Sequence, residues 1–545
     1  MTCTRPLVFL LSVFPAASSA APYPIYRAIR MGSVADVRAL LEAGGPAYFE
    51  DRPGPPSPLH EAVSLGRIAV ARLLLEHGAP PDEGGGSDQT ALCIAAYRGD
   101  LRMGRLLLEH GAKADRGRGW WRSPLYDAAL GGHTEMARLL LAHGADPNGG
   151  DTYGRNAITA AAEGGYAEVA EVLLRHGAAV NSLRDLRAGR DLEAIHIAAE
   201  NGHADVVRVL LDHGAPVEGA HNRGLTPLEH AAWNGRSAMV SSLRENGADY
   251  SVHAAAALGD IEEVRQALRR GEDANVRKPG DTSLLHWAVV SRRVDLVRLV
   301  LQYGANPNRE AEDFGPSPLC VAAQRGAVRV AALLLEAGAR IEPSRLEDHD
   351  PPLSAAAKAG NLRLAQLLVR YGADVNDRAG GYRLPLELAA GEGRLQVARF
   401  LISQGAAISG EGVHPLDEAA YRGHVEVATL LLQHGAPVTG DDWGTPLHAA
   451  AQQGRVGVAR VLLQHGADPN ALDQLDTRPL HDAAGKGHTA MVSLLLEHGA
   501  EVNALRWGDT PLTLALDGGH RETARFLRRH GGRDRYSGLE AGPQY

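Results

Sequence analysis

The sequence lacks a long apolar run and an excess of basic residues. After the N-terminal segment, no stretch reaches eighteen apolar residues, so we expect no integral membrane segment. The 56 basic and 65 acidic residues give a formal net charge of −9, and no block of five like charges occurs. A nucleic-acid-binding protein usually carries a basic patch or stripe, so we expect no nucleic acid partner.

The sequence also lacks the short motifs that carry catalysis or metal binding. It has no H-E-x-x-H, no paired C-x-x-C and no G-x-S-x-G sequence. The glycines at 84–86 and at 485–487 do not have the spacing or the context of a phosphate-binding loop. We therefore expect no catalytic residue, no metal site and no cofactor.

An internal repeat dominates the chain. The sequence LLEHGA at 74–79 returns at 107–112, and close variants follow at 140–145, 173–178 and 210–215. Glycines that end such segments recur at about 33 residues, from Gly44 to Gly531, and divide the chain into about sixteen units. A chain made of such units needs no central core, because each unit packs only on its neighbours.

Each unit begins with a short motif that predicts a helix start. The sequence is Ser-Pro-Leu-His at 57–60, Thr-Pro-Leu-Glu at 226–229 and Thr-Pro-Leu-His at 445–448. Serine or threonine caps the helix and proline suits its first position. A mid-unit glycine then predicts a turn into a second helix, whose end at glycine leads into an extended finger.

These motifs resemble the T-P-L-H-x-A signature of the ankyrin repeat family, and the tryptophan and tyrosine pattern of tetratricopeptide repeats is missing. The resemblance covers nearly the whole chain. It implies an all-α ankyrin-repeat solenoid of about sixteen helix-turn-helix units with extended, hairpin-like fingers. Two units, which begin near Tyr23 and Tyr250, have no finger before them. We therefore expect repeat blocks at 23–249 and 250–533, with a bend or hinge between them, and a short polar tail at 534–545.

The N-terminal segment differs from the repeats. Arg5 precedes an apolar run at 7–14 and a series of small residues that ends near Ala20. This order is typical of a secretory signal, so residues 1–20 are a candidate signal peptide. The protein would then be secreted or periplasmic. The alternative is a short hydrophobic cap or a misplaced start codon, in which case the protein is cytoplasmic.

Two of the three cysteines and most of the histidines have positions that the repeat explains, whereas Cys3 belongs to the N-terminal segment. Cys93 and Cys320 take the histidine position of the T-P-L-H motif in different units, too far apart for a disulfide, so we expect buried, inert thiols. Twenty of the 24 histidines lie before a terminating glycine, after a mid-unit glycine or in the T-P-L-H motif. An architectural role for these rings is expected rather than metal binding.

Large aromatic residues in the fingers are the strongest indication of a binding surface. Such side chains dominate protein-binding hot spots, although each could instead fold back on a neighbouring finger. The candidates are Trp120, Trp121, Tyr153, Phe314, Tyr382, Trp443 and Trp507.

The resemblance adds a second set of candidates. Ankyrin proteins also bind through the two residues that follow the alanine pair of the first helix, and these positions hold hot-spot residue types here. They are Tyr97, Arg98, Trp233, Asn234, Gln324, Arg325, Tyr421 and Arg422.

The sequence therefore predicts a non-enzymatic scaffold that binds a partner protein on its concave face and fingers. We expect a monomer, and the sequence does not identify the partner. The alternatives are an exported effector or periplasmic accessory protein, an adaptor that presents a target to another enzyme, and an enzyme that uses scattered repeat residues.

Overall fold

The computed structural model describes most of the repeat region. The described residues are 24–45, 47–48, 57–82, 89–115, 123–150, 156–181, 193–219, 224–276, 282–308, 316–341, 350–378, 383–410, 412, 414–440 and 444–534. They contain 32 α-helices and no β-strand, apart from two isolated bridges. The chain divides into two compact units, of which the first ends at Ser291 and the second begins at Arg292.

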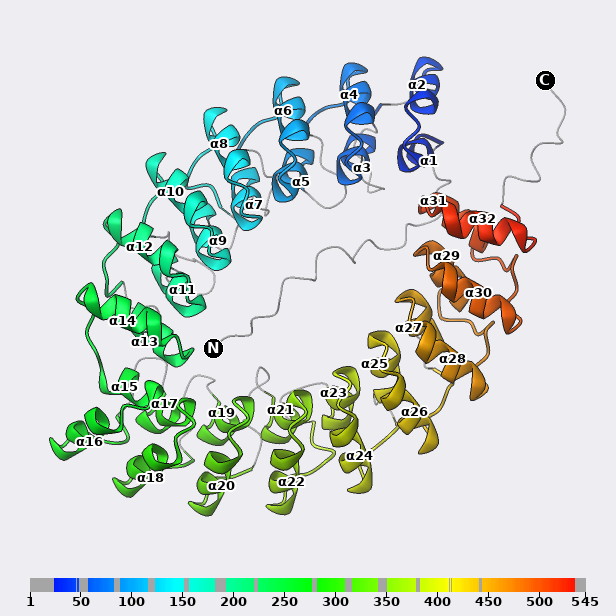
Figure 1. The fold of residues 1–545 in the computed structure, drawn as a ribbon. Coiled ribbons are helices and arrows are strands. Elements are labelled where there is room, and N and C mark those ends of the chain that lie inside the picture. The colour runs from blue at the N-terminus through cyan, green and yellow to red at the C-terminus, as the bar shows by residue number, and fades with distance from the viewer. Residues whose placement is uncertain are drawn as a thin grey trace. The chain divides into compact units, whose positions relative to one another are not determined.

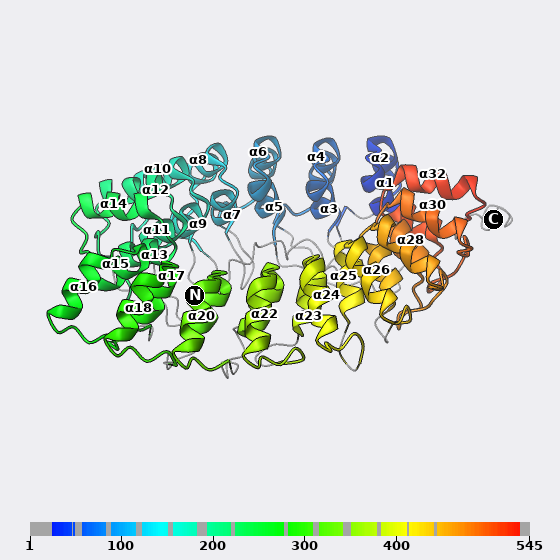
Figure 2. The ribbon, with the colours of Figure 1, turned by 60° about the horizontal axis from the view of Figure 1, so that its bottom comes forward.

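The first unit consists of two rows of helices, which are visible in Figures 1 and 2. We call the odd-numbered helices the inner row: α1 (Pro24–Met31), α3 (Pro58–Ser64), α5 (Ala91–Arg98), α7 (Pro124–Leu130), α9 (Ala157–Gly164), α11 (Ala194–Asn201), α13 (Pro227–Trp233), α15 (Val252–Leu258) and α17 (Leu284–Val290). The even-numbered helices form the outer row: α2 (Val34–Glu42), α4 (Ile68–Glu76), α6 (Leu101–Glu109), α8 (Thr134–Ala142), α10 (Ala167–Arg175), α12 (Ala204–Asp212), α14 (Ser237–Glu245) and α16 (Ile261–Arg269).

The second unit has the same two rows. Its inner row contains α19 (Pro318–Gln324), α21 (Pro352–Ala359), α23 (Pro385–Gly391), α25 (Pro415–Arg422), α27 (Pro446–Gln452), α29 (Pro479–Gly485) and α31 (Pro511–Asp517). Its outer row contains α18 (Val294–Gln302), α20 (Val328–Glu336), α22 (Leu362–Arg370), α24 (Leu395–Ser403), α26 (Val425–Gln433), α28 (Val456–Gln464), α30 (Thr489–Glu497) and α32 (Arg521–Arg529). The predicted all-α repeat solenoid is confirmed.

The predicted division at 249–250 falls inside the first unit. There α15 packs on α13 and on α17, so the inner row continues through this point. Ser251 Oγ donates a 2.6 Å hydrogen bond to Glu229 Oε1, which ties the start of α15 to α13. The predicted hinge between 249 and 250 stays a prediction. The candidate signal peptide at 1–20 and all but the first residue of the tail at 534–545 lie outside the described residues.

The helix boundaries follow from capping. Thr226 caps α13, since its hydroxyl accepts the Glu229 N–H at 3.2 Å, and the Glu229 carboxylate accepts the Thr226 N–H at 3.2 Å in return. Pro227 then occupies the first helical position, where no N–H is needed. At the other end of a pair, Gly499 has a φ of 89°, which lets the next N–H bond back to the Leu495 carbonyl at 3.0 Å.

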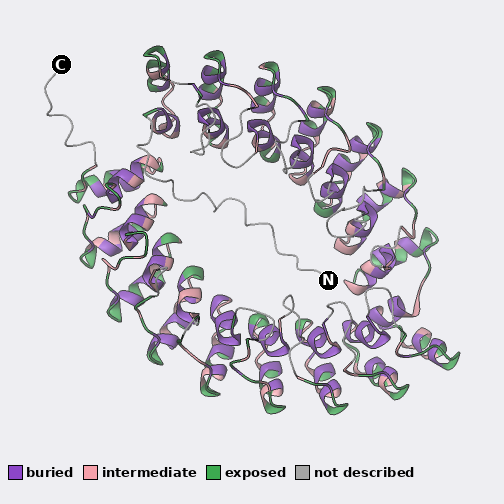
Figure 3. Cartoon of the chain, turned by 180° about the vertical axis from the view of Figure 1, so that it is seen from behind, coloured by how far each residue is buried: buried purple, intermediate pink, exposed green. Residues whose placement is uncertain are grey.

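In both compact units, the core lies between consecutive helix pairs. Inner-row alanines such as Ala449 and Ala450 keep side-chain bulk low, whereas outer-row leucines such as Leu431 fill the space between the rows. Figure 3 shows that buried residues line both rows and that exposed residues gather at the ends of helices. Each pair can bury its apolar face only against a neighbour, so stability comes from stacking.

Histidine side chains supply two recurring hydrogen bonds. Before a terminating glycine, His77 Nδ1 donates to the Leu73 carbonyl at 2.8 Å, and seven other repeats have the same cap. After the glycine between the two helices of a repeat, the histidine ring reaches the preceding repeat, as when His424 Nε2 donates to the Gly391 carbonyl at 2.9 Å. His133, His203, His488 and His520 make the same bond. These rings therefore have the architectural role that the repeat predicts.

Asparagine side chains hold consecutive fingers in register. Asn470 Oδ1 accepts the Glu501 N–H at 2.9 Å, and its Nδ2 donates to the Gly499 carbonyl at 3.0 Å. Asn148, Asn308, Asn376 and Asn503 make the same pair of bonds to the following unit. Each finger is thereby fixed at its base to the next one.

Candidate functional site

The ends of two inner-row helices present exposed tyrosines on a fixed backbone. Tyr97 and Tyr421 are both exposed at the ends of α5 and α25. The carbonyl of Tyr97 accepts a hydrogen bond from His133 Nε2 at 3.0 Å, and that of Tyr421 accepts one from Arg455 Nε at 3.3 Å. Their neighbours Arg98 and Arg422 are exposed as well, and Arg98 donates to the Ser64 carbonyl. These positions can contact a partner without rearranging the backbone.

Trp233 and Asn234 have structural contacts in addition to their partial exposure. The Trp233 ring meets the Trp287 ring edge to face, with centroids 5.0 Å apart at 75°. Trp287 is fully buried, and its indole N–H donates to Thr282 Oγ1 at 2.9 Å. Asn234 Nδ2 donates to the His230 carbonyl at 3.0 Å. The sequence did not indicate this packing, because Trp233 and Trp287 belong to different helices, α13 and α17, with α15 between them in the chain.

Gln324 and Arg325 follow the alanine pair of α19. Gln324 is exposed, whereas Arg325 is partly buried. Burial and the nearby charge of Arg292 lower the pKa of the Arg325 guanidinium. Because arginine stays charged at neutral pH, an acidic group that approached Arg325 would offset part of this unfavourable environment.

Most of the aromatic finger candidates lie outside the described residues. This applies to Trp120, Trp121, Tyr153, Phe314, Tyr382 and Trp443. Trp507 is the member of that set that the structure describes, and 51% of its surface is exposed. It therefore carries the structural evidence for a finger-based site.

Trp507 lies at the tip of a tight hairpin. Arg506 and Asp509 exchange two backbone hydrogen bonds of 2.9 Å, and between them Trp507 and Gly508 have φ values of 49° and 91°. Positive φ at both central residues is the pattern of a type I′ turn, which favours Asn-Gly. Tryptophan in this conformation costs on the order of 1 kcal/mol. The Arg506 guanidinium lies 4.8 Å from the ring centroid and supports the indole from one side.

Three exposed leucines accompany Trp507 on the last two fingers. Leu472 and Leu475 are 53% and 48% exposed on the finger before α29, and Leu505 is 61% exposed on the finger before α31. We call Leu472, Leu475, Leu505 and Trp507 the apolar finger patch. Sequence reasoning missed the leucines because it searched the fingers for aromatics only. Leucine at finger positions that are elsewhere polar is the signal that could have revealed them.

The backbone beneath the apolar finger patch is well fixed. Asp473 Oδ1 accepts the N–H groups of Leu475 and Thr477 at 2.8 and 2.7 Å, which closes the first of the two fingers. His481 Nε2 donates to the Ala504 carbonyl at 3.0 Å and thereby joins α29 to the second finger. An ion pair of 3.6 Å between Arg478 and Glu501 lies near this junction. The exposed side chains are thus presented from a rigid base.

Buried titratable groups elsewhere have architectural explanations. Burial raises the pKa of the Cys93 thiol to about 12, with a further contribution from Asp127, so the thiol is unreactive. Cys320 is also buried. Burial lowers the pKa of His60 and of His481 to about 4.

Among the described residues, no three His, Cys, Asp or Glu side chains are grouped so as to hold a metal ion. No described helix has the length and apolar character of a membrane span.

Comparison with known proteins identifies the repeats. A family model that describes three copies of the ankyrin repeat matches this chain. The matched residues are 25–118, 114–184, 180–253, 252–345, 304–379, 386–473 and 470–534.

Curated relatives share part of this region. Palmitoyltransferase Hip14 of Drosophila melanogaster is 33% identical over 85 residues, which is 16% of this chain and 13% of that protein. Human palmitoyltransferase ZDHHC13 is 32% identical over 85 residues, 16% of this chain and 14% of that protein. Palmitoyltransferase ZDHHC17 of Danio rerio is 30% identical over 93 residues, 17% and 15% of the two chains. Since the family model covers most of the sequence and the helix pairs repeat throughout the described residues, the chain belongs to the ankyrin repeat family, whose architecture supports protein–protein interaction.

Proposed function

We propose that this chain is a non-enzymatic scaffold that binds a partner protein through its fingers and its inner row. The apolar finger patch carries this proposal. Four large apolar side chains on two consecutive fingers are each about half exposed or more. Large apolar side chains that are exposed on neighbouring fingers favour burial against another protein.

Rigid presentation supplies the binding mechanism. The finger bases are held by Asn470 and Asn503, and the Trp507 turn is closed by two backbone hydrogen bonds. The ordering entropy of these groups is lost when the chain folds, so little more is lost when a partner binds. The exposed Tyr97 and Tyr421 would enlarge the contact surface of their respective units.

The relatives do not extend this function to catalysis. The matched part of the first relatives is about a seventh of their own length. Their palmitoyltransferase names describe proteins that are much longer than the matched segment. We therefore carry over only the interaction role of the repeats.

Partner capture tests the apolar finger patch. The full chain is immobilised, captured proteins are identified, and the affinity of the purified partner is measured by calorimetry. The double variant Leu505→Ala with Trp507→Ala should weaken binding at least tenfold, because it removes two hot-spot side chains. Its melting temperature should change little, because neither side chain is buried.

Leu65→Ala is the matched control, since Leu65 is an exposed leucine on a turn of the first unit. It should leave the affinity unchanged. Full retention of partner binding by the double variant would refute a role for the apolar finger patch, and a large fall in its melting temperature would assign the patch to the fold.

An exported accessory protein is the second candidate, and we propose it on the N-terminal sequence alone. The apolar run at 7–14 and the small residues that follow are typical of a signal peptide. Cell fractionation with N-terminal sequencing of the mature chain tests this proposal. A new N-terminus near residue 21 in an exported fraction would support it, whereas an intact N-terminus in the cytosol would favour a cytosolic scaffold.

A further inference from the structure

Helix α32 and the turn that follows it carry an excess of arginine. Residues 521–533 contain five arginines and one acidic residue, whereas the whole chain has a net charge of −9. Arg525, Arg528, Arg529 and Arg533 are all exposed. A polar outer face keeps a surface helix soluble, but a mixture of both signs of charge would serve that purpose equally well. Charge of one sign instead attracts a partner of the opposite sign.

Some of these arginines also have an architectural use. Arg528 and Arg529 lie in the last turn of α32, where positive charge is favourable beside the helix C-terminus. Arg528 also lies 3.8 Å from the Asp534 carboxylate. Arg525 lies in the middle of α32 and Arg533 lies beyond its end, so the helix dipole explains neither of them.

Arg525 lacks the ion pair that arginine forms at the same position of other outer-row helices. In α8, α12 and α16, the arginine at the fifth position pairs with the acidic residue at the second. The pairs are Arg138 with Glu135, Arg208 with Asp205 and Arg265 with Glu262. Glu522 and Arg525 hold these positions in α32, yet among the described residues neither forms an ion pair, and the same is true of Arg529 and Arg533. We call Arg525, Arg529 and Arg533 the arginine cluster.

The end of α32 is joined to the finger before α31, which is the second finger of the apolar finger patch. Asn503, at the base of that finger, accepts the Arg533 N–H at 2.7 Å and donates to the Gly531 carbonyl at 3.0 Å. The Thr510 hydroxyl, at the start of α31, donates to the Arg533 carbonyl at 2.5 Å. These bonds fix the backbone of Arg533 beside the finger, so the arginine cluster adjoins the apolar finger patch.

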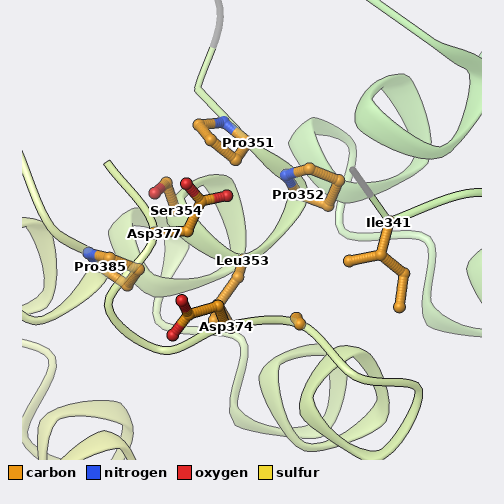
Figure 4. A pocket seen from close by; sticks show the side chains of 9 residues that line it. Ile341, Pro351, Pro352, Leu353, Ser354, Asp374, Asp377 and Pro385 are labelled. Atoms are coloured by element: carbon orange, nitrogen blue, oxygen red, sulfur yellow. The ribbon is translucent and has the colours of Figure 1, made fainter. Parts of the chain in front are cut away.

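A hollow elsewhere in the second unit differs from this surface in size and access. It is bordered by Leu353, Ser354 and Pro385, as Figure 4 shows, and its volume of about 20 Å³ gives room for about one water molecule. Such a volume excludes a side chain of a partner protein. The guanidinium groups of α32, in contrast, can be reached without entering the fold.

The surroundings of the arginine cluster favour an acidic protein segment over other polyanions. A guanidinium group forms two parallel hydrogen bonds to a carboxylate, so arginine suits this partner. Asp476 and Glu501 are exposed on the two fingers of the apolar finger patch. An anionic membrane or a long nucleic acid that covered the arginines would also approach these carboxylates and be repelled. A protein segment can place its acidic side chains on the arginines alone.

We propose that the arginine cluster binds an acidic segment of the partner protein whose apolar residues cover the apolar finger patch. Aspartate or glutamate side chains of this segment pair with Arg525, Arg529 and Arg533. The inference rests on the proposed scaffold function, because it states the chemistry of the partner. It adds selection by charge to a surface that is otherwise apolar.

The first test uses defined probes, so it does not need the partner. Binding of fluorescently labelled hexaglutamate to the full chain is measured by fluorescence anisotropy, with hexalysine as the probe of opposite charge. We expect hexaglutamate to bind and hexalysine not to bind. The affinity for hexaglutamate should fall as salt is added, because the contact joins exposed charges. An oligothymidylate and vesicles that contain phosphatidylserine are the alternative polyanions, and they should bind at least tenfold more weakly.

A triple variant locates the bound probe on the chain. Arg525→Gln with Arg529→Gln and Arg533→Gln removes three charges from exposed side chains and keeps good helix formers in α32. Binding of hexaglutamate should fall at least tenfold, while the melting temperature is maintained. The purified partner from the capture assay should lose affinity for this variant as well.

The matched control removes the same amount of charge from the first unit. In Arg72→Gln with Arg102→Gln and Arg105→Gln, three exposed arginines of α4 and α6 lose their charge. This variant has the same net charge as the α32 variant but keeps the arginine cluster. Its affinity for hexaglutamate should therefore match that of the unchanged chain.

Four results would overturn the inference. They are absence of hexaglutamate binding, equal affinities of the two triple variants, tighter binding of the oligothymidylate or the vesicles, and an unchanged affinity of the purified partner for the α32 variant. Leu505→Ala with Trp507→Ala should keep the affinity for hexaglutamate, because it leaves the arginines in place. Failure of the apolar finger patch in partner capture and failure of the arginine cluster are therefore distinguishable.

Discussion

Two tryptophans in this chain have opposite environments. Trp287 lies in α17 of the first unit, is fully buried, contacts Trp233 and bonds to Thr282 through its indole N–H. Trp507 lies on a finger of the second unit, is 51% exposed and adopts a left-handed backbone conformation. The comparison shows that burial decides the role of an aromatic residue in the repeat. Trp287, buried in an inner-row helix, stabilises the stack, whereas Trp507, exposed at a finger tip, is available for binding.

The largest expected effect comes from removing the buried tryptophan. Trp287→Ala should lower the free energy of unfolding by about 3–5 kcal/mol, because it removes a large core side chain and leaves a cavity between α13, α15 and α17. Urea denaturation followed by circular dichroism measures the change. Trp507→Ala is the control and should alter stability by less than about 0.5 kcal/mol. Similar losses for both variants would contradict the assignment of separate roles.

A buried histidine extends the comparison to pH. Burial lowers the pKa of His60 to about 4 in the folded chain, while the unfolded chain has the ordinary value of 6.5. Folding therefore favours the neutral ring. The contribution of His60 to the free energy of unfolding is complete above pH 6.5 and is lost as the pH falls towards 4. Between pH 7 and pH 5 this single group should reduce the free energy of unfolding by about 2 kcal/mol.

Urea titrations at the two pH values measure this effect. His60→Gln should reduce the difference in stability between pH 7 and pH 5, because it removes the buried imidazole. Burial and nearby Asp473 raise the pKa of Asp482 to about 7, so Asp482 opposes the trend by favouring the fold at lower pH. An unchanged pH dependence in the His60 variant would show that its ring is hydrated in the folded chain.

The smallest expected effect comes from replacing the exposed tryptophan. Trp507→Asn creates an Asn-Gly turn, which suits the two positive φ values at 507 and 508. The variant should be more stable by up to about 1 kcal/mol and should bind the partner more weakly. Thermal denaturation and calorimetry measure the two changes. A loss of stability would mean that the indole packs on its own finger strongly enough to outweigh the backbone strain.

Much of the fold was predictable because its signals are local. Ser57 with Pro58 and Thr226 with Pro227 mark helix starts, and each capping bond that they predict is present. The turn at Gly499 also requires only neighbouring residues. Repetition of these signals at about 33 residues determines how successive units stack, since each apolar face has one kind of neighbour.

The candidate site was less predictable because it depends on contacts between units. The position of Trp233 in the repeat suggests a binding residue, but its ring packs on Trp287, two inner-row helices further along the chain. Leu505 reads as an ordinary finger residue, but no neighbouring side chain covers most of its surface. Exposure at these positions depends on the lengths of side chains in adjacent repeats, which a motif does not encode.

The amino-acid sequence alone determined the family, the helix pairs and the architectural roles of most histidines, because short-range capping and apolar periodicity control these features. Only the tertiary structure revealed that Trp507 occupies a strained turn, that three leucines accompany it, and that Asn503 joins the end of α32 to the finger of Trp507. The physical reason is that burial and exposure arise between repeats, where the shape of one unit meets the shape of the next.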